Sequence, residues 1–339
     1  MAGHQLTRAV TVGPAQGSLP CAASPVCVRP AARTVPTDGA ATAPAAPPGP
    51  LVGYREPVEE GVLVRRFPSS RVLLVVAFGD PVRVGADGDA PARPLHSLVA
   101  GLQEETRVLG VGGSQHGVQL WLSPLTAYSL LGAPMHLVSN AYTELADLWG
   151  PRSARLTERL AAAEDWAARF ALLTSALARL RAEGPQPDPA VAYAWRQLTA
   201  TAGAARVGAL AERVGVSRRH LVRRFRQQVG LPPKTVARLL RFERAGALLR
   251  SGGRTLAEVA AQAGYADQSH LARDVREFTG VPAGELTALL RPAAPPPPTG
   301  PPAVAGRVVS AQPRLPSGHR REVPFVQAAR PGPLLLFRA

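Results

Sequence analysis

A pattern of two short helices occurs twice in the C-terminal half of the chain. The stretch "VGVSRRHLVRRFRQQVGLPP" (214–233) has a counterpart, "AGYADQSHLARDVREFTGVPA" (263–283), about fifty residues further along. In each copy a small Ala, a turn Gly and a Ser or Asp precede a basic helix that ends at Gly-x-Pro. Since a small residue and a glycine turn let two helices cross closely, the sequence predicts tandem helix-turn-helix units. The matched residues are Ala211, Gly215, Ser217, Leu221, Arg223, Phe225, Arg226, Gly230 and Pro232 in the first copy and Ala260, Gly264, Asp267, Leu271, Arg273, Val275, Arg276, Gly280 and Pro282 in the second.

The second helix of each predicted unit has an inward and an outward face. Helical spacing turns Leu221 and Phe225 inward in the first unit, and Leu271 and Val275 inward in the second. A helix cap is predicted at the start of each, at Ser217 and Asp267. The outward side holds Arg219, Val222 and Arg223 in the first unit and Gln268, Ser269, His270 and Arg273 in the second. A plain helical bundle with a basic surface is the alternative, which two tandem units joined by a helix over 232–252 make less favourable.

Positive charge is concentrated in the same region. The whole chain has a formal net charge of +15, and residues 206–291 contribute 16 basic against 7 acidic side chains, a net +9. Such a cluster predicts a polyanionic partner. Because Arg, Ala, Gly and Pro are abundant throughout the chain, the clustering is better evidence than the total charge.

Residues 189–290 resemble the DNA-binding domain of AraC/XylS-type bacterial transcriptional regulators. The resemblance is carried, in this order, by "LAERVGVSRRHLVRRFRQQVG", "RFERAGALL" and "LAEVAAQAGYADQSHLARDVREFTGVP". The family normally has an aromatic residue where Leu271 stands and Phe where Val275 stands. These departures change the packing of the second unit and leave its exposed face intact.

The resemblance implies how the two units meet DNA. In this family two recognition helices lie at the ends of a rigid linker helix and enter successive major-groove segments about 34 Å apart, on a site of about 20 bp. Arginine can bond guanine O6 and N7, glutamine can bond adenine N6 and N7, and Val222 can pack on a thymine methyl. The base-reading candidates by position are Arg219, Val222, Arg223, Gln268, Ser269, His270 and Arg273. Phosphate contacts or surface pairs are expected for Arg218, Arg224, Arg226 and Arg276. Linker residues Arg241 and Arg244 are expected to pair with Glu243 or Glu258.

The preceding residues, 51–184, predict a β-rich domain followed by helices. Short Val/Leu/Phe runs between Gly, Pro and Asp turns over 61–124 indicate a compact, mainly antiparallel β unit. One or two short helices are expected within 126–150, and apolar residues at three- and four-residue steps predict a helix over 153–183. With an all-α domain over 188–291, capped at Asp188, the fold class is α+β with two domains. Residues 1–50 are Pro/Ala-rich and residues 292–339 Pro-rich, and both are expected to be disordered tails.

Two motifs of this domain, "GVQLWLSPLTAYSLLGAP" and "WAARFALLTSALARL", resemble the domain that accompanies such DNA-binding modules. The resemblance implies binding of a small effector, dimerisation or both. A stripe in the helix over 156–181 either forms a dimer seam or packs on its own domain. Its residues are Leu160, Phe170, Leu173 and Leu177.

Other classes of site find little support. His96, His116 and His136 lie twenty residues apart and match no metal-ligand motif, so surface or core histidines are expected rather than a metal site. Cys21 and Cys27 lie in the first tail, where they support neither a disulfide framework nor a multi-cysteine sensor. No apolar run approaches the roughly 18 to 20 residues of a membrane span, and no secretory signal is evident, so a cytoplasmic location without a membrane partner is expected.

These observations predict a sequence-specific transcription regulator, not an enzyme, with no catalytic residues, cofactor or metal. Its predicted partners are double-stranded DNA, a small-molecule effector, a second copy of the chain, and RNA polymerase if it is an activator. The alternative from a different class is a β-domain enzyme or carrier whose basic helical half binds nucleic acid nonspecifically.

Overall fold

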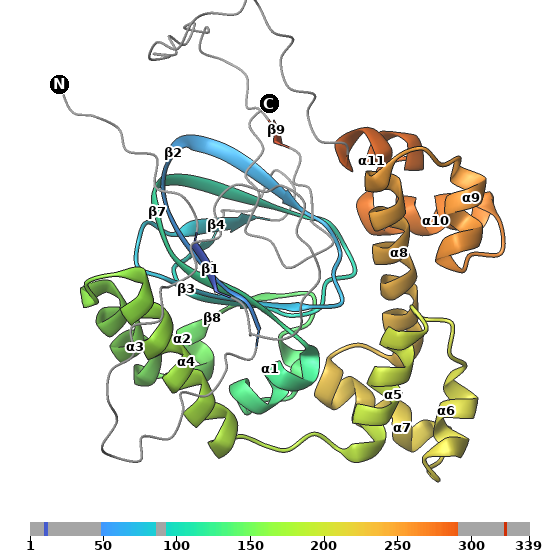
Figure 1. The fold of residues 1–339 in the computed structure, drawn as a ribbon, viewed down its shortest axis with the longest axis horizontal. Coiled ribbons are helices and arrows are strands. Elements are labelled where there is room, and N and C mark those ends of the chain that lie inside the picture. The colour runs from blue at the N-terminus through green and yellow to red at the C-terminus, as the bar shows by residue number, and fades with distance from the viewer. Residues whose placement is uncertain (1–9, 13–48, 86–92, 291–321, 324–339) are drawn as a thin grey trace, which may run out of the picture.

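The computed structural model describes residues 10–12, 49–85, 93–290 and 322–323. A curved β-sheet with helices at one end forms the N-terminal half, and residues 189–290 form a set of helices beside it (Figure 1). The predicted α+β class with an all-α second domain is confirmed. Most of the two predicted tails, with Cys21 and Cys27, lies outside the described residues. The segments described within them are short strands beside β2 and residues 49–50.

Two long strands form the centre of the sheet. β2 and β7 pair antiparallel along most of their length, and β7 also pairs with β3 and β4. The register shifts between Val58 and Val62, opposite a positive φ of 70° at Gly113. This bulge bends the two strands. As a result, β7 is one continuous strand although its sequence contains two separate apolar runs. The strands are β1 (Val10–Val12), β2 (Leu51–Arg66), β3 (Val72–Ala77), β4 (Val82–Gly85), β5 (Arg93–Leu95), β6 (Leu98–Ala100), β7 (Arg107–Leu122), β8 (Tyr142–Glu144) and β9 (Glu322–Val323).

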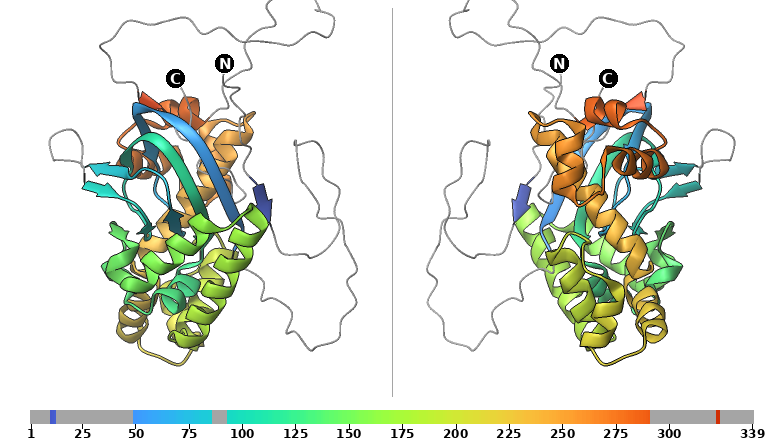
Figure 2. Two further views of the ribbon diagram at one scale, coloured as in Figure 1. Left: turned by 90° about the vertical axis from the view of Figure 1, so that its left-hand side faces the viewer. Right: turned by 90° about the vertical axis from the view of Figure 1, so that its right-hand side faces the viewer.

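The sheet is antiparallel except for the parallel contact of β9 with β2, in agreement with the predicted antiparallel unit. β4 and β5 project from the sheet as a hairpin (Figure 2). Alternate residues of β3 and β7 face two different apolar clusters, as expected for a sheet that is covered on both sides. Leu74, Leu120 and Leu122 belong to the large core shared with the helices, while Leu73 and Trp121 belong to a smaller cluster.

The predicted single helix over 153–183 is wrong in one respect, because the structure has two helices there. The chain leaves the helical conformation at Ala163, whose φ and ψ are extended, and Asp165 caps the next helix by accepting a hydrogen bond from Ala168 N at 2.7 Å. A local cap therefore divides one continuous apolar pattern. The N-terminal helices are α1 (Pro124–Leu131), the 3-10 turn η1 (Met135–Leu137), α2 (Leu145–Trp149), α3 (Pro151–Ala162) and α4 (Trp166–Glu183).

The apolar stripe of α3 and α4 packs inside its own chain. Leu160, Phe170, Leu173 and Leu177 are all at most 5% exposed and belong to the large core. Of the two interpretations of this stripe, the structure therefore favours packing on its own domain over a dimer seam. A second copy of the chain would have to bind elsewhere.

Between Pro189 and Leu290 the described chain forms helices and no strands. Asp188 caps α5 by accepting a hydrogen bond from Ala190 N at 2.8 Å. The helix predicted over 232–252 is α8, whose 19 residues join the two helix-turn-helix units. The helices are α5 (Pro189–Ala200), α6 (Val207–Arg213), α7 (Arg218–Val229), α8 (Pro233–Ser251), α9 (Leu256–Ala263), α10 (Gln268–Thr279) and α11 (Ala283–Leu290).

Candidate nucleic-acid interface

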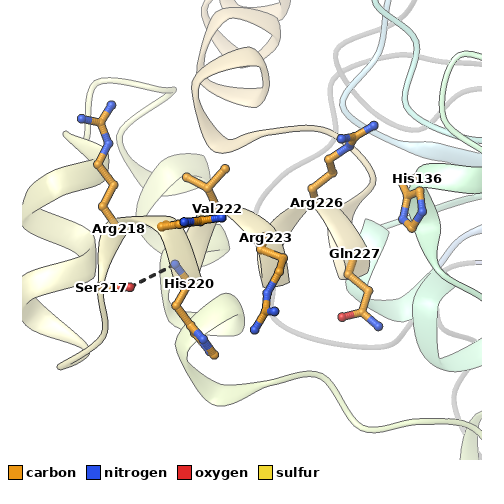
Figure 3. A pocket seen from close by; sticks show the side chains of 9 residues that line it. His136, Ser217, Arg218, His220, Val222, Arg223, Arg226 and Gln227 are labelled. Carbon is orange, nitrogen blue, oxygen red and sulfur yellow. Dashed lines mark hydrogen bonds between the residues drawn. The ribbon is translucent and has the colours of Figure 1, made fainter.

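The first unit consists of α6 and α7. Gly215, at a φ of 69°, forms the turn between them, and Ser217 Oγ accepts a hydrogen bond from His220 N at 3.2 Å. Leu221 and Phe225 are at most 1% exposed and fix the inner face of α7. The opposite face is open to solvent, with Val222 half-buried among exposed basic side chains (Figure 3). These exposed side chains are Arg218, Arg219, Arg223 and Arg226.

One arginine of α7 does not share this outward face. Arg224 Nε lies 3.4 Å from Asp188 Oδ2, and Arg224 Nη1 donates to Gln227 Oε1 at 3.3 Å. The buried amide of Gln228 also accepts a hydrogen bond from Asp188 N, at 2.9 Å. Of the two roles expected for Arg224, the geometry therefore supports a surface pair, here with the cap of α5. This pair joins α7 to the start of the domain.

The second unit consists of α9 and α10. Asp267 Oδ1 accepts a hydrogen bond from His270 N at 2.7 Å at the start of α10. Leu271 and Val275 are fully buried, so the two departures from the family pattern still fill the inner face. Five residues of α10 are exposed: Gln268, Ser269, Arg273, Arg276 and Glu277. This face is less uniformly basic than that of α7.

His270 differs from the other base-reading candidates because its ring packs against another aromatic ring of the chain. Its ring packs edge-on against Tyr265 with 5.0 Å between ring centroids, and the side chain is only half-exposed. Arg273, one turn further on, is exposed, and its Nε lies 3.5 Å from the carbonyl oxygen of Ser269. Five of the other candidates are exposed, whereas Val222 is half-buried like His270.

The linker helix α8 fixes α10 through a charged cluster that the sequence pattern did not reveal. Arg238 donates to both carboxylate oxygens of Glu277, at 2.9 and 2.6 Å, and to Asp274 Oδ1 at 2.8 Å. Its guanidinium also lies 4.9 Å from the ring centroid of Phe278. The hydrogen bonds to Glu277 and Asp274 raise the pKa of Arg238, and Arg238 lowers the pKa of Glu277. A planar guanidinium can bridge two carboxylates in this way, whereas lysine cannot.

The expected pairing of Arg241 and Arg244 with Glu243 or Glu258 is not what the structure shows. Glu258 forms a capping box with Thr255 at the start of α9. Arg241 Nη1 donates to the carbonyl oxygen of Gly203 at 3.2 Å. Arg244 is exposed and has no ion pair among the described residues. Sequence spacing on one helix did not reveal that the partner of Glu243 comes from another domain.

Glu243 instead joins the linker helix to the segment between β2 and β3 by hydrogen bonds. Its carboxylate accepts hydrogen bonds from Ser70 N at 2.8 Å, Ser70 Oγ at 2.6 Å and Ser69 Oγ at 3.3 Å. Burial raises the pKa of Glu243, and the serine hydrogen bonds oppose that shift. A second contact joins the two domains at the end of α10. There the carbonyl oxygen of Phe278 accepts hydrogen bonds from Thr106 N at 3.0 Å and from Thr106 Oγ1 at 3.1 Å. The helices α8 and α10 are thus attached to the N-terminal domain.

The three histidines singled out in the sequence lie in different environments. His116 packs edge-on against Phe78 and Trp166, and burial, with smaller contributions from Arg55 and Arg169, lowers its pKa to about 4. His96 is exposed before β6, and His136 is exposed on η1 beside α7. No cluster of His, Cys, Asp or Glu suited to a metal ion occurs among the described residues. In the same residues, no helix combines the length and apolarity needed to cross a membrane.

Comparison with known proteins bears on the C-terminal half. A family model described as a helix-turn-helix domain matches residues 210–288. The chain is similar to the C-terminal domain of AraT, a response regulator from Geobacillus stearothermophilus, at 23% identity over 31% of this chain and 88% of that chain, with a TM-score of 0.29. It is also similar to an AraC-type transcriptional regulator from Chromobacterium violaceum, at 27% identity over 30% of this chain and 90% of that chain, with a TM-score of 0.28.

ToxT from Vibrio cholerae is similar over more of the chain, at 11% identity over 70% of this chain and 97% of that chain, with a TM-score of 0.39. No curated protein matches the chain significantly. The match to the family model confirms the helix-turn-helix prediction for the region that contains α7 and α10.

Proposed function

We propose, from the AraC-type helix-turn-helix domain that residues 210–288 form, that this chain is a sequence-specific DNA-binding transcription regulator. The observation that carries the proposal is the pair of capped helices, α7 and α10, whose inner faces are buried and whose outer faces expose arginine and polar side chains. Rigid helices with exposed donors suit a major groove, where each base pair presents its own pattern of donors and acceptors.

Each helix has side chains suited to base edges. On α7, Arg219 and Arg223 are the candidates for guanine, and Val222 is the candidate for a thymine methyl. On α10, Gln268 is suited to adenine, Arg273 to guanine, and Ser269 to either. Exposed Arg218, Arg226 and Arg276 are assigned to phosphates, which position the protein without reading sequence.

The linker helix suits a site that spans two turns of the major groove. α8 has 19 residues, which at 1.5 Å per residue extend over about 28 Å. This length is close to the roughly 34 Å repeat of B-form DNA, so units at its two ends can enter successive segments of the groove. Because the two reading faces differ in composition, the proposed site is asymmetric and about 20 bp long.

Base reading by α10 is tested with two arginines of one helix. Arg273→Ala should cost roughly 1–3 kcal/mol of specific binding and relax the preference at one base pair, because a bidentate contact is lost. Arg276→Ala should weaken binding to all sequences equally, because phosphates carry no base identity. Selection from random DNA with each purified variant, followed by titration of the selected site, measures both effects. Equal weakening by Arg273→Ala on specific and random DNA would reject base reading.

The competing function is nonspecific binding of nucleic acid by a basic helical domain. Footprinting separates the two, since a regulator protects a defined sequence, whereas a nonspecific binder gives uniform protection and a steep dependence on salt. The proposed setting is the bacterial cytoplasm. If the protein is an activator, we propose that it also contacts RNA polymerase. We further propose a homodimer, which light scattering after size exclusion tests.

We also propose that a small anionic effector binds inside the β-sheet. Arg66 is 2% exposed, and none of its three guanidinium nitrogens has a hydrogen-bond partner among the described residues. Its guanidinium stacks 4.7 Å from the ring centroid of Trp121 and lies 5.7 Å from that of Tyr142. The amide of Gln119 is likewise buried without a described partner, and the buried hydroxyl of Tyr142 interacts electrostatically with Arg66. Because buried polar groups are normally hydrogen-bonded, these donors support a ligand carrying a carboxylate or phosphate.

The effector proposal is tested by thermal unfolding with benzoate, acetate and inorganic phosphate as probes. At least one should raise the melting temperature of the wild type, because a ligand that binds only the folded state stabilises it. The variant Arg66→Met should not respond to that probe. A wild type that responds to none of the three would reject the anionic class.

A further inference from the structure

The N-terminal domain forms part of the wall of the groove that follows α7. Eight of the residues lining this groove come from α7 and its cap, and the ninth is His136 of η1. In Figure 3, His136 lies beyond Arg226 and Gln227, at the C-terminal end of the row of α7 side chains. A residue from the other domain thus stands at one end of the surface proposed to read DNA.

Tight packing holds η1 at this place. Gly230, which ends α7 at a φ of 109°, lies so close to η1 that an added Cβ would clash with Ser139 Oγ and approach the Met135 carbonyl oxygen. Met135 and Val138, which flank His136 and Leu137, are at most 1% exposed in the core shared with α7. Moving His136 away from α7 would therefore require unpacking buried side chains, which is costly.

The chemistry of the groove suits a polyanion along its whole length. The exposed basic side chains of α7 line it, and neither Asp nor Glu is among its nine lining residues. When a recognition helix lies in the major groove, the phosphates of the duplex flank it on both sides. An exposed imidazole at the end of the helix can donate an N–H to such a phosphate oxygen. Duplex DNA is therefore the ligand that fits both the exposed face of α7 and His136 at its end.

We propose that the N-terminal domain contacts DNA directly, through His136 donating a hydrogen bond to a backbone phosphate beside the segment read by α7. This inference rests on the proposed DNA-reading function and extends the interface beyond the helix-turn-helix domain. It makes His136 a contact to the backbone rather than a base reader. The N-terminal domain, which has no recognition helix, would then directly affect the affinity of the protein for duplex DNA.

Charge substitutions at this exposed position test the inference in the full chain. His136→Asp should weaken binding to a selected site by about 3- to 10-fold, and His136→Arg should strengthen it by a similar factor, because one phosphate contact is repelled or reinforced. The slope of log affinity against log salt should become steeper by about one for His136→Arg. Fluorescence anisotropy over a salt series measures both quantities.

The matched controls are His96→Asp and His96→Arg, which make the same charge changes at an exposed histidine before β6. They should change affinity less than 2-fold. Hydroxyl-radical footprinting adds a local readout, since His136→Asp should remove protection from the backbone beside the α7 segment and leave the α10 segment unchanged.

Three results would overturn the inference. If both His136 variants bind like the wild type, η1 lies off the duplex. If His136→Asp binds more tightly, η1 obstructs the DNA instead of gripping it. If the wild type selects no sequence, the proposed function fails together with this inference, whereas selective binding that is indifferent to His136 removes this inference alone.

Discussion

Two buried charged residues, Asp274 and Arg66, have opposite environments. Asp274 is 4% exposed and accepts a hydrogen bond from Arg238, so its charge is compensated. Arg66 is buried more deeply, and its closest described partners are the rings of Trp121 and Tyr142. Burial lowers the pKa of Arg66, and the neighbouring Tyr142 opposes that shift. In a buried site, an aromatic ring stabilises a cation less than a carboxylate would. The buried charge of Arg66 therefore lowers the folding stability of the ligand-free protein.

Replacing Arg66 with an apolar side chain of similar length should therefore stabilise the protein. Arg66→Met is expected to raise the free energy of unfolding by about 1–3 kcal/mol, because a desolvated charge is removed while the packing against Trp121 is kept. Urea denaturation measures the change. The control is Arg107→Met on the facing strand, where Arg107 is partly exposed and pairs with Glu105, and a change within about 0.5 kcal/mol is expected. A destabilised Arg66→Met would show that the guanidinium stabilises the free fold.

The position of α10 depends on its contacts with α8 as much as on its own sequence. Its hydrogen-bonded cap, Asp267, fixes where it begins, but the Arg238 cluster and the contact of Phe242 with Phe278, at 5.2 Å between centroids, fix how it lies. Leu271 and Val275 are smaller than the residues usual in the family. The ion cluster and these aromatic rings therefore carry much of the attachment of the second reading helix.

Arg238→Ala should destabilise the second unit by about 2–4 kcal/mol, because it leaves the buried Asp274 carboxylate without its partner. Hydrogen exchange of α10 amides and urea denaturation measure the loss. Arg244→Ala, at an exposed position of the same helix, is the control and should change stability by less than about 0.5 kcal/mol. Similar losses in both variants would mean that the helix itself, and not the ion cluster, is being disturbed.

The same cluster gives the protein a predictable response to acid. Arg238 lowers the pKa of Glu277, so this carboxylate stabilises the fold at pH values above the ordinary glutamate pKa of about 4.3. That contribution is lost as the pH falls through the lowered pKa. The loss of stability below about pH 4.3 should consequently be smaller in Arg238→Ala than in the wild type. Urea denaturation at several pH values compares the two proteins.

The N-terminal domain contacts all three central helices of the C-terminal domain, α7, α8 and α10. η1 packs on the end of α7, Ser70 binds Glu243 in the middle of α8, and Thr106 binds the carbonyl oxygen of Phe278 at the end of α10. The helices α7 and α10 and the linker α8 between them are therefore all attached to the N-terminal domain. A change in the N-terminal domain can reach the two faces proposed to contact DNA through these contacts.

Removing the central attachment should loosen the two domains without unfolding either. Glu243→Ala takes away the acceptor of three hydrogen bonds, and the deuterium uptake of Ser70 N–H and its neighbours should rise, while that of the α7 core stays as in the wild type. Exchange measured by mass spectrometry follows this. Glu285→Ala, an exposed glutamate on α11, should leave the exchange of β3 and α8 unchanged. An unchanged Ser70 segment in Glu243→Ala would mean that apolar packing alone joins the domains.

Several features of the candidate site follow from short-range patterns. The turn at Gly215 and the burial of Leu221 and Phe225 depend on neighbours within a few residues, and the sequence predicted each of them. The side-chain hydrogen bond that Ser217 accepts is equally local. The base-reading roles of the exposed side chains stay predictions, since they concern a partner and not the fold. The break between α3 and α4 was missed because the apolar period continues across a cap that only Asp165 marks.

The repeated helix-turn-helix unit, the antiparallel sheet before it and the excess of positive charge around α7 and α10 could all be predicted from the amino-acid sequence. Helical periodicity, turn glycines and formal charge are properties of neighbouring residues, so they can be read along the chain. Three other features became visible in the folded chain alone: Glu243 binds Ser70, 173 residues away, Arg66 is enclosed beside Trp121, and His136 lies at the end of α7. Such contacts depend on how whole elements pack, and no local pattern encodes them.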